Sequence, residues 1–463
     1  MKQFLPFYTL DGSVGLYNED YEDIYHSVTG AVSESYDKFI LPADILNIIK
    51  NNNEIKLLDI CFGIGYNSKS FLNFILKNYS ENKFLPRKIL STSIDMIYTN
   101  NNSDNSLNID TIYTDKNMVS TDIKLYNDKI YTNKIYDKDL PCSLHDKNKI
   151  DKIFINAIDI DKFSALISPF ILTGVKNIKK YNKNLKNEKI KKLLEKYKLK
   201  IYYNIFKNNK NLSKLLKYPD AIGFFLLNKL ISQHEDLIFS DDIRDLLFDI
   251  SMKPFLSKNL LLYYKLLYFE RYINNPIRHL FAFLHNIYYM YLSCRYKNDL
   301  KRLKMLNIDF ELKIKDARQV LLNDNNVYNL IFLDGFTASK CPCLWSYEFI
   351  RLLSEHISDD GLILTYSTAL PLRNAFIKSN LHIGNILDSE NNIIGTIASK
   401  NKNLIKFELS EYDLGLLKTK SGIVYRDENL DGLNEAIIEA RNIEVKNSNK
   451  ISASEYKRKY AKA

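Results

Sequence analysis

Residues 55–67 have the sequence IKLLDICFGIGYN. The apolar run 55–61 predicts a short buried strand, and the helical spacing of the apolar residues after it predicts a helix over 68–76. Gly63 and Gly65, between strand and helix, let the backbone pass close beneath a ligand, and a helix N-terminus attracts an anion. The pattern therefore predicts an α/β fold with a ligand-binding loop at the end of a strand.

This loop differs from a dinucleotide-binding loop at one position. Ser68 stands where the third glycine of that fingerprint would be, which disfavours a pyrophosphate cofactor. S-adenosyl-L-methionine fits better, because its methionine carboxylate is small enough for one helix N-terminus. The residues that we expect around this cofactor are Asp59, Gly63, Gly65 and Asn67. A tight turn without a ligand is the alternative.

The ribose of such a cofactor requires an acid at the end of the second strand. Asp159 ends the apolar run 153–159, whereas Asp95 lies at the usual distance after the loop. We prefer Asp159, which makes residues 83–150 an insertion between the first helix and the second strand. Asp316 follows the predicted third strand and is placed to accept a hydrogen bond from the adenine amino group.

A second informative stretch, residues 330–345, has the sequence LIFLDGFTASKCPCLW. Its apolar start predicts a strand that ends in Asp334, at the carboxyl edge of a parallel sheet, where open α/β folds bind ligands. Phe336 and the only tryptophan of the chain, Trp345, follow. We therefore expect a pocket around Asp334; the alternative is an acid that merely caps a helix.

The remaining segments alternate between strand and helix patterns, which predicts a mostly parallel, doubly wound sheet with helices on both faces. Residues 382–386 and 395–398 are expected to close it as an antiparallel pair. We divide the chain into an N-terminal segment with the first part of the α/β domain (1–82), a low-complexity insertion (83–150), a second-strand region (151–175), a Lys-rich helical insertion (176–275), the second part of the α/β domain (276–400) and a C-terminal extension (401–463).

Composition restricts the partners. The chain of 463 residues has 65 Lys and Arg against 55 Asp and Glu, formally +10, which favours a polyanionic partner. No apolar run reaches the length of a bilayer span and the N-terminus lacks a signal-peptide pattern, so we expect a cytoplasmic protein without a membrane partner. The five cysteines show no paired CxxC spacing, and we expect neither a disulfide framework nor a metal site.

Several motifs together resemble the MnmC-type tRNA wobble-uridine methyltransferases. They cover about half of the chain in the order of that family. They are TLDGS at 9–13, YHS at 25–27 with Gly30, Ala31 and Glu34, the loop 59–67, LHNIY at 284–288 with Ser293 and Arg295, Asp316, the stretch from Asp334 to Trp345, and GIVYRD at 422–427.

The resemblance implies a class I, Rossmann-like methyltransferase with a seven-stranded sheet that uses S-adenosyl-L-methionine. It implies methyl transfer to the aminomethyl nitrogen of 5-aminomethyl-(2-thio)uridine at the wobble position, giving 5-methylaminomethyl-(2-thio)uridine, with the anticodon arm of tRNA as the partner. Asp334 would favour binding and deprotonation of the amine, and Phe336 would stack on or enclose the flipped base together with Trp345.

The resemblance assigns further residues to the same pocket. Tyr25 and Glu34 would help to close it around the cofactor, and Lys340 and Arg295 would contact the substrate. Bifunctional family members carry an FAD-dependent oxidase domain, but no Gly-rich dinucleotide loop follows residue 400. We therefore expect the stand-alone methyltransferase form, which needs a separate enzyme to supply the aminomethyl substrate. The alternatives are a methyl- or aminopropyltransferase acting on a small amine, and a tRNA-binding protein without catalysis.

Overall fold

The computed structural model describes residues 4–9, 11–18, 23–25, 30–80, 83–84, 150–173 and 219–460. The predicted insertion 83–150 lies almost entirely outside the described residues, as does the alternative ribose acid Asp95. His26 and Ser27 of the YHS motif and the first part of the Lys-rich segment 176–275 also lie outside them.

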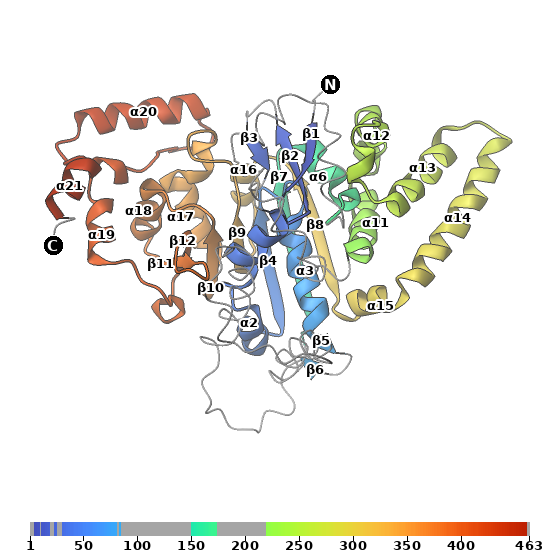
Figure 1. Cartoon of the computed structure of the whole chain (residues 1–463), viewed down its shortest axis with the longest axis horizontal. Helices are drawn as coiled ribbons and strands as arrows, with labels where there is room; N and C mark the ends of the chain where they lie inside the picture. Colours follow the sequence, from blue (N-terminus) through green and yellow to red (C-terminus); the bar gives the residue numbers. More distant parts are fainter. Residues whose placement is uncertain are drawn as a thin grey trace, which may run out of the picture.

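A seven-stranded sheet forms the centre of the molecule, as the sequence predicted (Figure 1). Its strand order is β11-β12-β10-β9-β4-β7-β8. The strands are β4 (Glu54–Ile60), β7 (Lys152–Asp159), β8 (Ile308–Ile314), β9 (Tyr328–Leu333), β10 (Ile357–Thr365), β11 (His382–Leu387) and β12 (Ile393–Ser399). The strands from β8 to β10 pair in parallel, whereas β12 runs antiparallel to both β10 and β11. The closing antiparallel pair is therefore confirmed.

Both faces of the sheet are buried, because successive side chains of a strand point to opposite sides. In β9, Leu330 and Phe332 belong to one apolar cluster and Ile331 and Leu333 to another. The first cluster includes apolar residues of α3 (Tyr66–Asn78), and the second includes those of α17 (Tyr347–His356) and α18 (Leu370–Lys378). Helices on both faces are thus confirmed. The carboxyl ends of the parallel strands are left for a ligand.

The N-terminal segment forms a small antiparallel sheet of β1 (Phe4–Tyr8), β2 (Val14–Asn18) and β3 (Asp23–Tyr25). It continues into α1 (Ala31–Ser35), a π-helical turn at Tyr36–Ile40 and α2 (Ile45–Asn51). The backbone N–H of Val14 donates to the hydroxyl of Tyr66 at 2.8 Å, which fixes this segment to the start of α3. This attachment holds Tyr25 and Glu34 beside the glycine loop.

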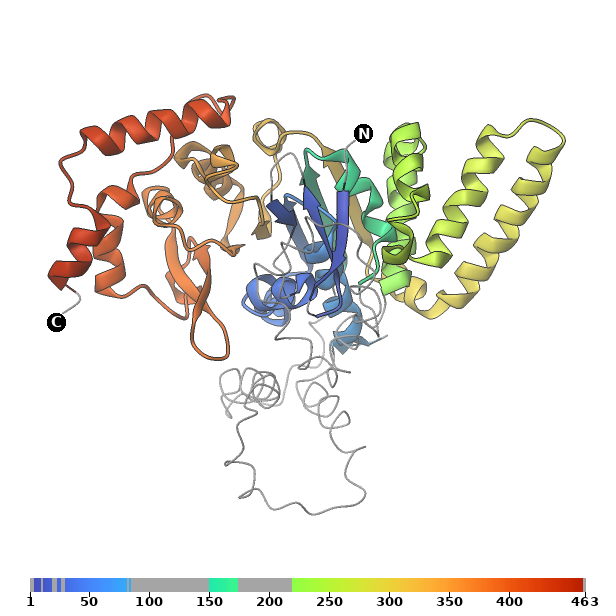
Figure 2. The ribbon, with the colours of Figure 1, turned by 45° about the horizontal axis from the view of Figure 1, so that its top comes forward.

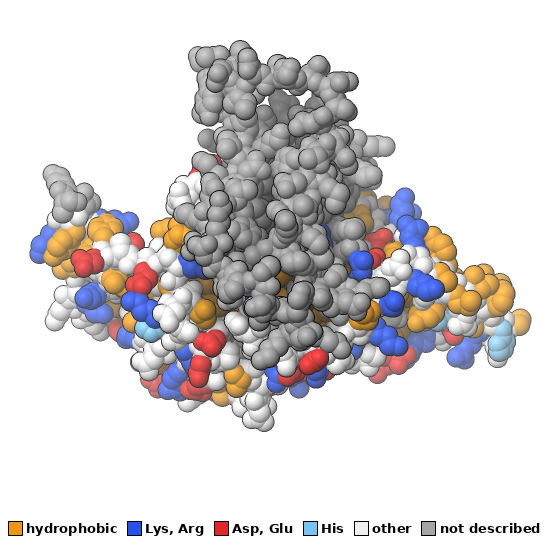
Figure 3. All heavy atoms as spheres, turned by 90° about the horizontal axis from the view of Figure 1, so that it is seen from below, with side chains coloured by type: hydrophobic (Ala, Val, Ile, Leu, Met, Phe, Trp, Pro, Cys, Tyr) orange, Lys and Arg blue, Asp and Glu red, His pale blue; other side chains and the backbone are white. Residues whose placement is uncertain are grey.

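A helical region lies between β7 and β8. It contains α6 (Lys162–Ile167), α11 (Pro219–Ile238, kinked at His234), α12 (Asp241–Phe248), α13 (Lys258–Tyr272), α14 (Ile277–Arg295) and α15 (Lys297–Met305). The hairpin of α13 and α14 projects away from the sheet in both ribbon views (Figures 1 and 2). Several apolar side chains of α14 are exposed on it, including Phe283 at 61% and Met290 at 65%. Figure 3 shows hydrophobic side chains gathered at this end of the molecule. Among the described residues, no helix is both long and apolar enough to cross a bilayer.

The C-terminal part covers the other end of the molecule (Figure 2). It contains α19 (Glu411–Leu417), α20 (Asn434–Asn447) and α21 (Ala453–Tyr460). The short elements are α16 (Ala317–Leu321) after β8, the pair β5 (Tyr79–Ser80) and β6 (Lys83–Phe84), and 3-10 turns at Ser168–Phe170, Lys253–Phe255, Pro342–Trp345, Lys402–Leu404 and Lys420–Gly422.

Candidate active site

A cavity of about 450 Å³ lies at the carboxyl ends of β4, β7, β8 and β9. β4 stands between β7 and β9, so the strand order reverses there, and open α/β sheets bind ligands at such a point. Seven residues predicted from the sequence line the cavity: Tyr25, Glu34, Gly63, Asp159, Asp316, Asp334 and Phe336. Its volume is within the range of small-molecule and cofactor sites.

The glycine loop forms one wall of the cavity. Gly63 and Gly65 have φ angles of 53° and 78°, in the left-handed region that favours glycine. A Cβ atom at Gly65 would lie 2.7 Å from the ring of Phe62, and one at Gly63 would lie 3.3 Å from the ring of Tyr25. Both positions therefore favour glycine, and at Gly63, which lines the cavity, the absence of a side chain also leaves space beside Tyr25.

Asp159 holds the glycine loop to the end of the second strand. One carboxylate oxygen accepts from the N–H of Gly63 at 2.6 Å, and the other accepts from the N–H of Asp161 at 2.7 Å. Burial raises the pKa of Asp159 to about 6. Asp161, to which the sequence analysis gave no role, accepts a hydrogen bond from the hydroxyl of Tyr25 at 3.0 Å and also lines the cavity. Two carboxylates thus stand where one was expected.

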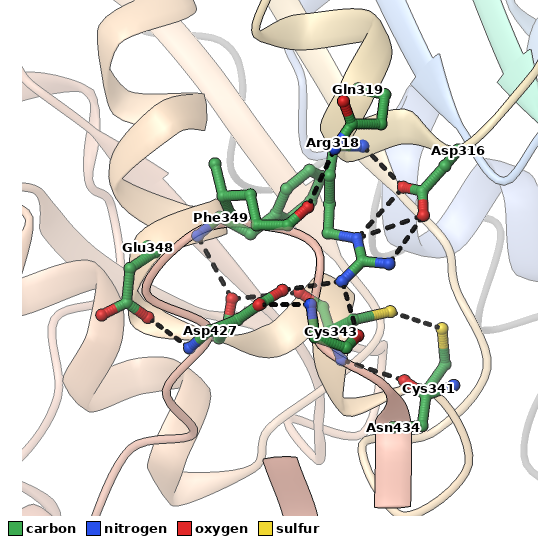
Figure 4. A network of polar contacts seen from close by, with 12 residues as sticks. Asp316, Arg318, Gln319, Cys341, Cys343, Glu348, Phe349, Asp427 and Asn434 are labelled. Atoms are coloured by element: carbon green, nitrogen blue, oxygen red, sulfur yellow. Dashed lines mark hydrogen bonds and ion pairs between the residues drawn. The ribbon is translucent and has the colours of Figure 1, made fainter. Parts of the chain in front are cut away.

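Asp316 stands at the third strand's end, as predicted, but it is part of an ion-pair network (Figure 4). Its carboxylate accepts from the N–H of Arg318 at 2.9 Å, which caps α16, and forms a 2.7 Å ion pair with the Arg318 guanidinium. The same guanidinium pairs with Asp427 at 2.7 Å. Glu348 in turn accepts from the N–H of Asp427 at 2.7 Å and from Arg426 at 2.6 Å. The motif at 422–427 therefore anchors the C-terminal part beside the cavity.

Asp334 and Phe336 form the part of the cavity wall next to the glycine loop, because β9 pairs with β4 and the N–H of Asp334 donates to the carbonyl oxygen of Ile60 at 3.2 Å. The side-chain amide of Asn67 donates to Asp334 at 2.8 Å, so the acid is oriented by the first turn of α3. The ring of Phe336 lies 5.2 Å from the ring of Tyr25. The hydroxyl of Tyr366 donates to the carbonyl oxygen of Gly335 at 2.9 Å. Contacts from several elements thus fix the loop that follows β9.

Six predicted site residues lie outside the cavity wall, which corrects their expected contacts. Gly65 is buried within the glycine loop. Asp59 is fully buried beneath the loop, where the hydroxyl of Ser68 donates to it at 2.6 Å and burial raises its pKa to about 7. Asn67 is 3% exposed and acts through Asp334. Trp345 is 1% exposed and cannot stack on a base from this position.

The Trp345 indole instead donates to the carbonyl oxygen of Phe336 at 2.8 Å, so it supports the loop from behind. Lys340 is exposed outside the cavity wall. Arg295 ends the projecting α14, where it donates to the hydroxyl of Tyr291 at 2.7 Å. Nothing in the sequence pattern distinguished these supporting and distant positions from the cavity wall itself.

The cavity wall also contains residues that the sequence analysis did not assign. They include Lys38, Cys61, Lys315, Arg318, Cys341, Cys343 and Tyr366. The three cysteines lie close in sequence to the two predicted loops, which could have indicated their place in the cavity wall. Nothing in the sequence indicated that Lys38 and Tyr366 would line it. Among the described residues, no group of three or more His, Cys, Asp or Glu side chains is arranged to hold a metal ion.

The residues of the cavity fit S-adenosyl-L-methionine. Five carboxylates line the wall against three cationic side chains, which suits a positively charged sulfonium. The carboxylates are Glu34, Asp159, Asp161, Asp316 and Asp334, and the cations are Lys38, Lys315 and Arg318. The glycine loop would hold the methionine end, and the acids after β7 and β8 can accept hydrogen bonds from hydroxyl and amino groups.

Comparison with known proteins agrees with this fit. Residues 279–392 match the model of a family described as S-adenosyl-L-methionine-dependent methyltransferase. The uncharacterized protein MJ0670 of Methanocaldococcus jannaschii is 28% identical over 156 residues, which are 32% of this chain and 40% of that protein. The chain therefore matches less than half the length of this relative.

The crystal structure of MNMC2 from Aquifex aeolicus is similar with a TM-score of 0.45 and 16% identity, over 97% of this chain and 87% of that one. This likeness is too distant to carry a conclusion about the substrate. The matched residues 279–392 include β8 to β11 and the cavity residues Asp316, Asp334 and Phe336, so this part of the chain is similar to an S-adenosyl-L-methionine-dependent methyltransferase family.

Proposed function

We propose that the chain methylates the aminomethyl nitrogen of 5-aminomethyl-(2-thio)uridine at the wobble position of tRNA, as an MnmC-type enzyme. The product would be 5-methylaminomethyl-(2-thio)uridine. The observation that carries this proposal is Asp334 in the cavity wall, followed by Phe336 and hydrogen-bonded to Asn67 at the end of the glycine loop. The motifs that resemble the MnmC type support the choice of substrate.

Asp334 has the chemistry that an amine substrate requires. An alkylammonium has no lone pair, so it must lose a proton before its nitrogen attacks a methyl group. Bound S-adenosyl-L-methionine would supply that methyl group on a sulfonium. Asn67 holds the Asp334 carboxylate with a 2.8 Å hydrogen bond, which keeps it directed at one point of the cavity. Such positioning places the amine for in-line attack and favours its deprotonation.

Aromatic side chains beside Asp334 suit a base taken out of its stack. Phe336 and Tyr25 line the cavity with their ring centroids 5.2 Å apart, and Tyr366 lines it as well. A flipped uridine base would meet the Phe336 ring while its aminomethyl group reaches Asp334. Trp345 supports this arrangement through its hydrogen bond to the carbonyl of Phe336.

The charge of the chain suits the proposed partner. A formal net charge of +10 favours binding of a polyanion such as the anticodon arm of tRNA, and Lys340 and Arg295 are exposed cations that would contact it away from the cavity. A separate enzyme would supply the aminomethyl group, and the cytoplasm would be the place of action. The small-amine alternative is supported by the same five cavity carboxylates, which would also bind a polyamine.

A nucleoside assay tests the proposal. The protein is incubated with labelled S-adenosyl-L-methionine and tRNA from cells that lack this methylation, and the tRNA is then digested to nucleosides. Label in 5-methylaminomethyluridine or its 2-thio form is the expected result. Label found only on added polyamines would favour the small-amine enzyme, and tRNA binding without any label would favour a non-catalytic binder. Binding measured over a salt series should weaken steeply, because phosphate contacts release counterions.

The variant Asp334→Asn tests the role of the acid. Loss of the carboxylate should lower the rate of methyl transfer by at least about 100-fold, the usual contribution of general acid–base catalysis. The affinity for S-adenosyl-L-methionine should stay nearly unchanged. Asp359→Asn is the matched control, because its side chain is 97% exposed in β10. A folded Asp334→Asn protein with the activity of this control would exclude the assigned role.

A further inference from the structure

Three thiols line the methyl-transfer cavity, although methyl transfer to an amine uses none of them. They belong to Cys61 after β4 and to Cys341 and Cys343 in the segment after β9. The sulfur atoms of Cys341 and Cys343 lie 3.5 Å apart, with only Pro342 between the two residues (Figure 4). A disulfide bond is about 2.05 Å long, so closing the gap requires a movement of about 1.5 Å shared by two side chains.

The two thiols are held in this arrangement by backbone contacts. The N–H of Cys341 donates to the carbonyl oxygen of Thr337 at 2.9 Å, and Cys343 lies in the 3-10 turn Pro342–Trp345. Cys343 is 7% exposed, and its accessible surface belongs to the cavity wall. A small reagent would therefore reach the pair through the cavity.

We propose that Cys341 and Cys343 form an oxidative modification site, which peroxides or small-molecule disulfides convert reversibly into an intrachain disulfide. With a peroxide, one thiol becomes a sulfenic acid as the O–O bond breaks, and the second thiol then displaces water to form the S–S bond. With a small disulfide, exchange passes through a mixed disulfide and releases two molecules of the small thiol. In both routes the cysteines lose two electrons and two protons to the oxidant.

The position of Cys343 beside the Arg318 guanidinium favours it as the attacking thiol (Figure 4). The hydrogen bond with Cys341 lowers the pKa of Cys343, and the nearby guanidinium of Arg318 adds to this effect against the opposing effect of burial. The thiolate is the reactive form of cysteine in both routes. The pKa of Cys341 is raised by the same hydrogen bond, which leaves Cys341 as the resolving thiol. Burial raises the pKa of Cys61, the third thiol of the cavity wall.

Disulfide formation would alter the cavity, because the segment with the two thiols packs against the loop after β9. A Cβ atom at Gly335 would lie 3.2 Å from Leu344, the residue after Cys343, so the contact there is already close. Cys343 also stands beside the Asp316–Arg318 pair, on the side where the adenosine would bind (Figure 4). We therefore expect oxidation to weaken cofactor binding, and bound cofactor to slow oxidation.

This expectation rests on the cofactor class and is independent of the tRNA substrate. The experiment uses the full chain with Cys142→Ser and Cys294→Ser, because Cys294 is exposed on α14 and Cys142 lies outside the described residues. Protein is treated with hydrogen peroxide or oxidised glutathione, digested without reduction and mapped by mass spectrometry. The affinity for S-adenosyl-L-homocysteine is measured by calorimetry before treatment, after treatment and after dithiothreitol.

The expected result is one peptide that contains both Cys341 and Cys343 and is lighter by two hydrogen atoms until it is reduced, together with an affinity lower by about tenfold, which is about 1.4 kcal/mol. Dithiothreitol should restore the affinity, and saturation with S-adenosyl-L-homocysteine should slow the oxidation. Cys341→Ser and Cys343→Ser should each have the same affinity before and after the oxidant. The proposal is wrong if oxidation yields only sulfinic acid or other cysteine pairs, or if the Cys341–Cys343 disulfide forms and the affinity does not change.

Discussion

Replacing the buried acid beneath the glycine loop, Asp59→Asn, should stabilise the protein in a pH-dependent way. Asp59 is fully buried: one carboxylate oxygen accepts from the hydroxyl of Ser68 at 2.6 Å, and the other has no hydrogen-bond partner among the described residues. Burial raises its pKa from 3.8 to about 7. The folded protein therefore keeps a proton on this carboxyl over a pH range in which the unfolded chain has released it.

The sign and size of the effect follow from this pKa. Because the pKa is raised in the folded state, stability is lost as the pH rises from about 4 to about 7, and the full penalty applies above pH 7. Each pKa unit corresponds to about 1.36 kcal/mol. The carboxyl therefore lowers the free energy of unfolding by about 4 kcal/mol at pH 8, and this loss is smaller by about 3 kcal/mol at pH 5. An asparagine does not titrate, and its amide oxygen can still accept from Ser68.

The assay is urea unfolding of both proteins at pH 5 and pH 8, followed by the fluorescence of Trp345. This residue is the only tryptophan and is 1% exposed, so its emission reports exposure of the core behind the cavity. The advantage of Asp59→Asn in unfolding free energy should grow by about 3 kcal/mol from pH 5 to pH 8. Asp159 titrates in both proteins, and its contribution cancels in the comparison.

An equal difference at the two pH values, or an Asp59→Asn protein that is less stable at pH 8, would refute this account of the buried acid. The same variant separates a supporting role from a cofactor contact. Because Asp59 lies beneath the loop and outside the cavity wall, the affinity for S-adenosyl-L-methionine should change by less than about threefold, or about 0.6 kcal/mol. A much larger loss in a folded protein would return Asp59 to the set of residues that touch the cofactor.

Two further substitutions test neighbouring parts of the site. Trp345→Phe removes the hydrogen bond to the carbonyl of Phe336 and should lower the free energy of unfolding by about 1 kcal/mol. It should also reduce kcat and leave the cofactor affinity unchanged. A normal kcat would show that the loop needs no such support. Burial lowers the pKa of Lys69 from 10.5 to about 7, so the folded protein releases this proton before the unfolded chain does, and stability rises with pH between these values. Lys69→Met cannot titrate, and its stability relative to the natural protein should therefore fall by about 2 kcal/mol between pH 7 and pH 9 in urea unfolding. A constant difference would contradict the buried, uncharged lysine.

Much of the fold and part of the site could be predicted from local patterns. The two strand-loop stretches at 55–67 and 330–345 predicted the acids and glycines that meet in the cavity, since parallel strands bring their carboxyl ends to one edge. The antiparallel closing pair was also visible as two apolar runs separated by a polar turn. Local patterns did not reveal which of these side chains would be covered by another element.

The sequence by itself determined the α/β class, the glycine loop and the positions of Asp159, Asp316 and Asp334 at strand ends, because strand and helix periodicity and glycine conformations are local properties. Only the tertiary structure decided what each side chain touches. Asp59 is on the face of β4 that α3 covers, so it is buried, and Trp345 supports the loop from behind.

Long-range contacts were equally invisible in the sequence. Arg318 pairs with Asp427, 109 positions further along the chain, and the thiols after β9 reach the same cavity as Cys61 after β4. Such contacts depend on how helices pack over the sheet, and packing selects among many chemically acceptable neighbours for each residue. The kinds of groups at the sheet edge are therefore written in the sequence, whereas their burial, pairing and access to the cavity arise only when the layers come together.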